Sequence, residues 1–135
     1  MHGPRDALQR LRNDPGAVSA LCRRHKVVLL AAFGSTVGSK PDPGDLDLAI
    51  LADHSGPGPD FLAVLGDLME LTEFEGIDLM HLNRAGPVAR EGALVNAEIL
   101  YESKVGIWAN AVTAATMERM DTQWLRDLSL TEMAL

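Results

Sequence analysis

The stretch that decides the fold is AAFGSTVGSKPDPGDLDLAIL, residues 31–51. Its glycine-serine pair, Gly34-Ser35, follows an apolar run, and the aspartates Asp45 and Asp47 flank one leucine about ten residues later. Both acids lie in a segment whose other residues are mostly apolar. A charge placed in such a segment requires a reason, because burying an unpaired carboxylate is costly.

Outward from this stretch, the hydrophobic pattern predicts strands and helices that alternate along the chain. The predicted strands cover residues 26–33, 45–51, 77–82 and, as a short edge strand, 97–102. The predicted helices cover residues 13–25 and 60–74, with Asp14 and Asp60 as N-caps and Gly76 as the breaker of the second, then 87–96 and 106–128, the last broken near Asp121. The turn at 40–44 contains two prolines. We predict an α/β (or α+β) fold, a small mixed sheet flanked by helices.

Composition indicates one globular domain over residues 1–135, with its core at about 27–103. The chain is 47% hydrophobic and 23% charged, and it lacks any apolar run near the ~20 residues of a membrane span. Its single cysteine, Cys22, excludes an internal disulfide and a cysteine-based zinc site. The polar N-terminal stretch lacks the apolar segment of a signal peptide. We therefore expect a cytoplasmic protein.

Charge narrows the expected partners. The net charge of −7 argues against direct binding of nucleic acid, which a basic face would have to support. Basic residues do gather at Arg10, Arg12 and 23–26. This group fits either a solvated helix face or a surface that binds an acidic partner or phosphates.

The two aspartates of the second predicted strand suggest a metal site. Side chains two residues apart on a strand project to the same side, so Asp45 and Asp47 would point together. Neighbouring carboxylates repel each other unless a cation lies between them. Oxygen ligands of this kind suit Mg²⁺, which binds one or two carboxylates together with substrate phosphates. Asp78, in the third predicted strand, would add a further carboxylate if that strand lies beside the second.

The glycine-serine pair suggests a phosphate site next to this metal site. Gly34 would let the backbone approach a ligand closely, and the Ser35 hydroxyl and the following amides could bind phosphate oxygens. Together the two sites describe a nucleoside triphosphate site. Three acids on one face would also suit metal-assisted nucleotidyl transfer, which must neutralise charge on the attacking and leaving oxygens.

In this order and spacing, Gly-Ser, Asp-x-Asp and a later strand aspartate resemble the signature of the polymerase-beta-like nucleotidyltransferase superfamily. The segment GIDLMHLNRAGPVAREGALVNAEILYES, residues 76–103, resembles the minimal nucleotidyltransferase (MNT) family. The resemblance covers about residues 27–103. It implies a polymerase-beta-like nucleotidyltransferase fold.

The resemblance also implies roles for individual residues. Gly34 and Ser35 would contact nucleotide phosphates. Asp45 and Asp47 would bind Mg²⁺, and Asp78 would be a third metal ligand or the general base. Many members carry an arginine soon after Gly-Ser, where this chain has Gly38, and Lys40 is the cation that could replace it.

The implied function is that of the antitoxin in a HEPN–MNT pair, which transfers AMP from ATP to a tyrosine of the HEPN ribonuclease toxin. The missing arginine and an acidic surface suited to a basic partner leave open a non-catalytic antitoxin that acts by binding. A small-molecule adenylyltransferase of the aminoglycoside type is a third alternative, although the chain is short for an acceptor domain. A homo-oligomer could complete the acceptor side.

Overall fold

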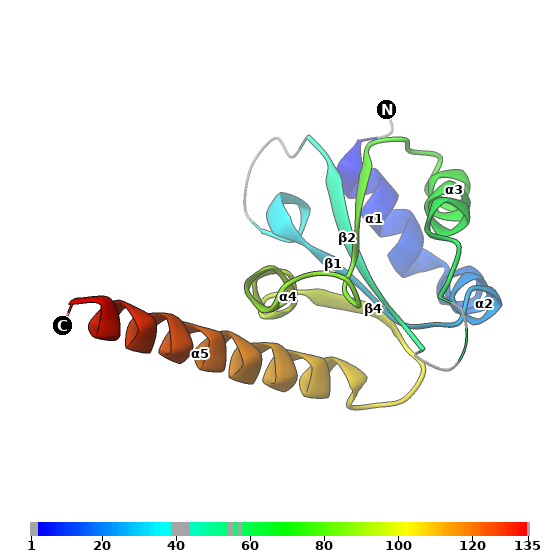
Figure 1. The fold of residues 1–135 in the computed structure, drawn as a ribbon. Coiled ribbons are helices and arrows are strands. Elements are labelled where there is room, and N and C mark those ends of the chain that lie inside the picture. Colours follow the sequence, from blue (N-terminus) through cyan, green and yellow to red (C-terminus); the bar gives the residue numbers. More distant parts are fainter. Residues whose placement is uncertain (1–2, 39–43, 54–55, 57, 135) are drawn as a thin grey trace.

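A four-stranded mixed sheet forms the centre of the protein, with helices on both of its faces (Figure 1). The computed structural model describes residues 3–38, 44–53, 56 and 58–134. In spatial order the strands are β3 (Ile77–His81), β2 (Leu46–Ala52), β1 (Val27–Phe33) and β4 (Glu98–Glu102). β1 runs antiparallel to β2 and β4, whereas β2 and β3 are parallel. The predicted strands are confirmed, and 97–102 does form an edge strand.

One face of the sheet is covered by α1 (Pro4–Asn13), α2 (Pro15–Arg24) and α3 (Phe61–Thr72). The predicted N-caps are confirmed: the Asp14 carboxylate accepts from the Ala17 amide at 3.0 Å, and Asp60 accepts from the Ala63 amide at 3.2 Å. The pattern of β2 is also as expected, because Leu46, Leu48 and Ile50 are all buried in this face. The α1 helix was not predicted, although it adds three buried residues to the core, namely Ala7, Leu8 and Leu11.

The opposite face is covered by α4 (Pro87–Leu94) and by the first part of α5 (Ile107–Ala134). Buried Ala93 and Leu94 of α4 pack with Leu29 of β1 and Ala49 of β2, and Trp108 of α5 lies against this cluster. Beyond that contact α5 extends away from the sheet (Figure 1). No helix among the residues described above has the length and apolar character needed to cross a membrane.

Two details of the predicted helices differ in the structure. The α3 helix ends at Thr72, shortly before the predicted end at Phe74, because Glu73 adopts a left-handed conformation (φ 54°) that terminates it. The α5 helix is not broken near Asp121 and continues to Ala134. It contains neither glycine nor proline, and a single aspartate lowers helix propensity by only about 0.7 kcal/mol.

The basic cluster near the N-terminus forms ion pairs within the chain. The Arg12 guanidinium donates to both oxygens of Glu98, at 2.7 and 2.6 Å, and so joins α1 to β4. This contact lowers the pKa of the Glu98 carboxyl, since the hydrogen bond favours its charged form. Arg10 pairs with Glu73 at 3.0 Å. These two arginines therefore stabilise the domain rather than form a separate basic surface.

Candidate active site

The Gly34-Ser35 pair lies in a single 3₁₀ turn, η1 (Gly34–Thr36), that directly follows β1. Gly34 has φ +76°, and a Cβ built on it would lie 2.2 Å from Oδ2 of Asp47 and 3.1 Å from its Cγ. No pair of heavy atoms tolerates that approach, so any side chain here would displace the carboxylate. The sequence needs glycine at position 34 because the turn lies directly against Asp47.

Asp47 and Asp78 are neighbours across the parallel strands β2 and β3, where their Cα atoms are partners in the register. Asp45 lies one residue before β2. The pKa of Asp47 is raised, first by its burial and then by the negative charges of Asp78 and Asp45. The three predicted acids are thus close enough to act on one another electrostatically.

The fit of this group to a divalent cation is partial. In the part of the chain that the structure describes, no three His, Cys, Asp or Glu side chains form a ready-made metal cluster. After burial, the negative charges of Asp78 and Asp45 also raise the pKa of Asp47, and a cation would relieve that repulsion. Mg²⁺ commonly takes only one or two protein carboxylates and completes its shell with phosphate oxygens and water. Asp45 and Asp47 fit that donor set, and Asp78 as a third ligand remains a prediction.

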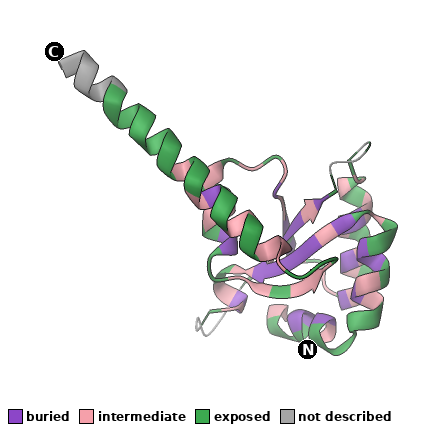
Figure 2. Ribbon diagram, turned by 90° about the horizontal axis from the view of Figure 1, so that it is seen from below, coloured by how far each residue is buried: buried purple, intermediate pink, exposed green. Residues whose placement is uncertain are grey.

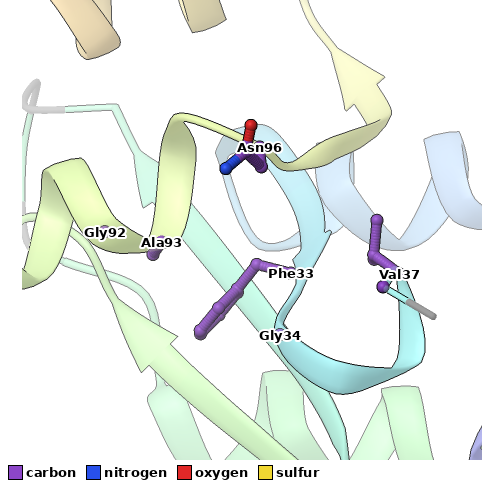
Figure 3. Close-up of a pocket in the computed structure, with 7 residues that line it drawn as sticks. Phe33, Gly34, Val37, Gly92, Ala93 and Asn96 are labelled. Atoms are coloured by element: carbon purple, nitrogen blue, oxygen red, sulfur yellow. The ribbon is translucent and has the colours of Figure 1, made fainter. Parts of the chain in front are cut away.

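A pocket of about 470 Å³ opens beside the Gly34 turn, between that turn and α4 (Figure 3). It is lined by the end of β1, by the turn, and by α4 with the residues that follow it: Phe33, Gly34, Val37, Gly38, Gly92, Ala93 and Asn96. Of the residues predicted to contact phosphates, Gly34 lines the pocket. Ser35 lies in the same turn but is not among these lining residues, and Lys40 lies outside the described residues.

The sequence-based prediction missed the contribution of α4. Gly92 and Ala93 have little or no side chain, so α4 leaves space at this wall of the pocket. The exposed Asn96 offers an amide group to a ligand. The adjacent small residues of 92–93 on a helix were the available signal, since a small side chain allows close approach.

Thr36 was also missed. It is 5% exposed, and its hydroxyl donates to the carbonyl oxygen of Asp45 at 2.9 Å. The amides of Val37 and Gly38 donate to the carbonyl of Gly34, at 3.3 and 3.2 Å. Thr36 thereby attaches the turn to the start of β2 and fixes the backbone that carries the first acid.

A second pocket, of about 390 Å³, is lined by Pro59, Phe61, His81 and Arg84. His81 stacks on Phe61, with ring centroids 6.1 Å apart. Because His81 follows Asp78 by three residues on β3, the two side chains leave opposite faces of the sheet. The prediction of a packed histidine, separate from the acids, is confirmed.

Comparisons with known proteins show the fold. No family model matches the chain, and neither does any curated protein. Several solved structures of toxin–antitoxin complexes do match, over nearly the full length of both chains. A toxin–antitoxin complex with AMP-PNP gives a TM-score of 0.68 at 17% identity, covering 90% of this chain and 99% of that one.

Two further solved structures of toxin–antitoxin complexes also match the fold of this chain. A complex of the tri-AMPylated Shewanella oneidensis HEPN toxin with its MNT antitoxin gives a TM-score of 0.65 at 16% identity, covering 93% of this chain and 99% of that one. A MntA–HepT toxin–antitoxin complex gives 0.63 at 16% identity, covering 91% and 98%. The chain therefore matches MNT antitoxins in structure, and the predicted fold, a mixed sheet flanked by helices as in MNT nucleotidyltransferases, is confirmed.

Proposed function

We propose that this protein is a Mg²⁺-dependent nucleotidyltransferase that moves AMP from ATP to a tyrosine hydroxyl of a HEPN-type toxin, and so acts as its antitoxin. The contact that carries the proposal is that between Gly34 and Asp47. Gly34 lines the open pocket and lies directly against Asp47, a carboxylate of raised pKa that is not itself among the lining residues. A phosphate group held by the turn would lie next to the acids.

Different residues of the chain would have different roles in this transfer. Asp45 and Asp47 would hold Mg²⁺, while Gly34, Ser35 and Lys40 would contact the phosphates. Bound Mg·ATP supplies the electrophilic α-phosphorus and pyrophosphate as the leaving group. As the acceptor oxygen bonds to that phosphorus and the bond to pyrophosphate breaks, Asp78 would take the hydroxyl proton as general base, if it is not a metal ligand. Asp78 is exposed, which suits an acceptor that arrives on another protein.

The structural neighbours support this assignment. One was determined with AMP-PNP, and another contains a tri-AMPylated HEPN toxin with its MNT antitoxin. Those are properties of those proteins, at 16–17% identity to this one. They make ATP the first donor to test and a HEPN-type toxin the first acceptor.

A second candidate function is neutralisation by binding alone. Gly38, which stands near where many MNT members carry an arginine, favours it, and the net charge of −7 suits binding to a basic partner. A binding antitoxin would inhibit its toxin without ATP. The same toxin assay therefore separates the two functions.

The first experiment is calorimetric titration of the protein with Mg·ATP. Saturable binding is expected for the parent and should be lost in Asp47→Asn or without Mg²⁺. Glu70→Gln is the matched control, because Glu70 is an exposed carboxylate on α3, across the sheet from the site. If the folded parent protein does not bind Mg·ATP, the nucleotidyltransferase function is rejected and neutralisation by binding alone becomes the proposed function.

The second experiment follows AMP transfer to the toxin by mass spectrometry. Each transfer adds one AMP to a toxin tyrosine, and Asp47→Asn should abolish it. If the Asp47→Asn protein still neutralises an unmodified toxin in a ribonuclease assay without ATP, neutralisation is by occlusion. Aminoglycosides, offered as acceptors in the same assay, should remain unmodified.

A further inference from the structure

The α5 helix has one face that its own domain uses. Ala115 is 1% exposed, and the Trp108 indole nitrogen donates to the Leu94 carbonyl at 2.9 Å. One turn beyond Ala115, Arg119 donates to Glu91 of α4 at 2.7 Å. These contacts identify the side of α5 that packs on α4.

The opposite side of α5 carries an apolar stripe that nothing in the described structure covers. It consists of Met117, Met120, Trp124 and Leu128, which are 62%, 57%, 63% and 42% exposed. Their spacing of three, four and four residues puts them in one row. Met117 is two residues from buried Ala115, hence about 200° around the helix. Figure 2 shows this part of α5 exposed and projecting beyond the sheet and its other helices.

The stripe is therefore not an extension of the core. The row contains a tryptophan and two methionines, residue types that are enriched at the centre of protein interfaces. Single exposed apolar residues are ordinary, whereas a continuous row on a projecting helix marks a binding surface.

The charges beside the stripe indicate what it binds. Asp121 follows Met117 by four residues and Asp127 follows Trp124 by three, so acids border the stripe on both sides. Arg119 and Arg126 are seven residues apart and lie on the other side of the helix, toward α4. Pairing the stripe with that of a second copy would bring acidic borders together, which is unfavourable. The complementary surface is an apolar groove with basic residues along its rim.

We infer that this apolar stripe of α5 is the surface on which the partner toxin docks, through an apolar groove rimmed by Lys and Arg. The inference rests on the proposed function for the identity of the partner, and it deepens that function by giving the toxin a place to bind. A protein that binds and cleaves RNA must carry cationic residues. The acidic borders of the stripe are suited to such a surface. The stripe lies on the side of α5 that faces away from α4, so the toxin would bind across α5 from the pocket.

The test measures binding of the co-expressed HEPN-type toxin to the full chain by calorimetry without ATP. Trp124→Asp and Leu128→Asp should each weaken binding at least about 30-fold, as expected for central interface residues. Leu62→Asp is the matched control: Leu62 is 74% exposed on α3, across the sheet, and its substitution should leave toxin affinity unchanged. Asp121→Lys should weaken binding and reduce its salt dependence.

Binding of Mg·ATP, measured on the same variants, should be unchanged, and AMP transfer should show a raised KM for the toxin with kcat retained. Equal toxin affinity for the parent, Trp124→Asp and Leu128→Asp would overturn the inference while leaving the enzyme intact. A dimer of the parent chain in sedimentation that Leu128→Asp dissociates would also overturn it, in favour of a second copy. If toxin binding depends on the stripe but no AMP is transferred, the docking surface is supported and the proposed nucleotidyltransferase activity is rejected.

Discussion

Replacement of Gly34 by alanine tests the central contact of the site. The added methyl carbon would lie 2.2 Å from Oδ2 of Asp47, and φ is +76° at this position. A left-handed backbone costs a non-glycine residue roughly 1–2 kcal/mol. Moving the carboxylate away from its rotamer adds about 0.5–1.5 kcal/mol, and the stiffer unfolded chain returns about 0.4–1 kcal/mol. We expect Gly34→Ala to lower the free energy of unfolding by about 2 kcal/mol.

A double-mutant cycle separates the two causes. Asp47→Ala removes the carboxylate and leaves only the Asp47 Cβ, 3.3 Å from the new methyl. Within the Asp47→Ala background, Gly34→Ala should therefore cost about 1 kcal/mol, the backbone strain alone. Gly66→Ala is the control, because Gly66 lies inside α3 with nothing within 4 Å of its built Cβ, and alanine there should stabilise by about 0.5–1 kcal/mol.

Urea unfolding of the four proteins of the cycle, followed by circular dichroism, gives these free energies. Gly34→Ala should also abolish Mg·ATP binding, since the displaced carboxylate is a proposed ligand. A Gly34→Ala cost below about 0.5 kcal/mol, or the same cost with and without Asp47, would show that the turn and the acid are not in contact.

Three further predictions concern titratable groups. Asp47→Asn should stabilise the metal-free protein at pH 7 by up to about 1 kcal/mol, because it removes a partly buried charge and its screened repulsion by Asp78 and Asp45. Since the pKa of Asp47 is raised, this gain should vanish in melts at a pH below the ordinary aspartate pKa. Glu98→Gln should lower the free energy of unfolding at pH 7 by about 0.5–1 kcal/mol. Since Arg12 lowers the pKa of Glu98, this loss should fade in melts as the pH drops below the ordinary glutamate pKa. A loss that stays constant with pH would exclude the ion pair as its cause. Burial raises the pKa of the Cys22 thiol to about 12, so a disulfide reagent should label Cys22 at the rate of unfolding, and immediate labelling of the folded protein would contradict its burial.

The strands and the acid pattern could be predicted because each is encoded locally. Alternation in the second strand fixed which residues of β2 face the core, and Asp14 and Asp60 mark helix starts by a chemistry confined to three residues. The pairing of Asp47 with Asp78 was predicted only as a condition, that their strands be neighbours. The structure satisfies that condition.

What could not be predicted depends on contacts distant in sequence. The wall that α4 adds to the pocket arises from packing of residues about sixty positions apart, such as Gly34 and Asn96. The role of Thr36 depends on a carbonyl across a turn whose path the sequence does not reveal. The first helix has more charged than apolar residues, so its sequence gives only a weak signal for a core helix, and its contribution depends on tertiary contacts of Arg12 and the buried leucines.

Because β2 and β3 are parallel neighbours, the register between them determines whether Asp78, the third acid, lies beside Asp47. As an edge strand, β3 is aligned in the sheet by β2 alone, through the Asp47–Asp78 register and the Leu46 amide bond to the Gly76 carbonyl at 2.9 Å. Side chains alternate along a strand, so a slip of β3 by one residue would send Asp78 through to the α3 side of the sheet. The loop that enters β3 thus acts as a spacer of fixed length. Its length should change more slowly in evolution than its composition, because one inserted residue would separate the acids while every residue of the site was still present.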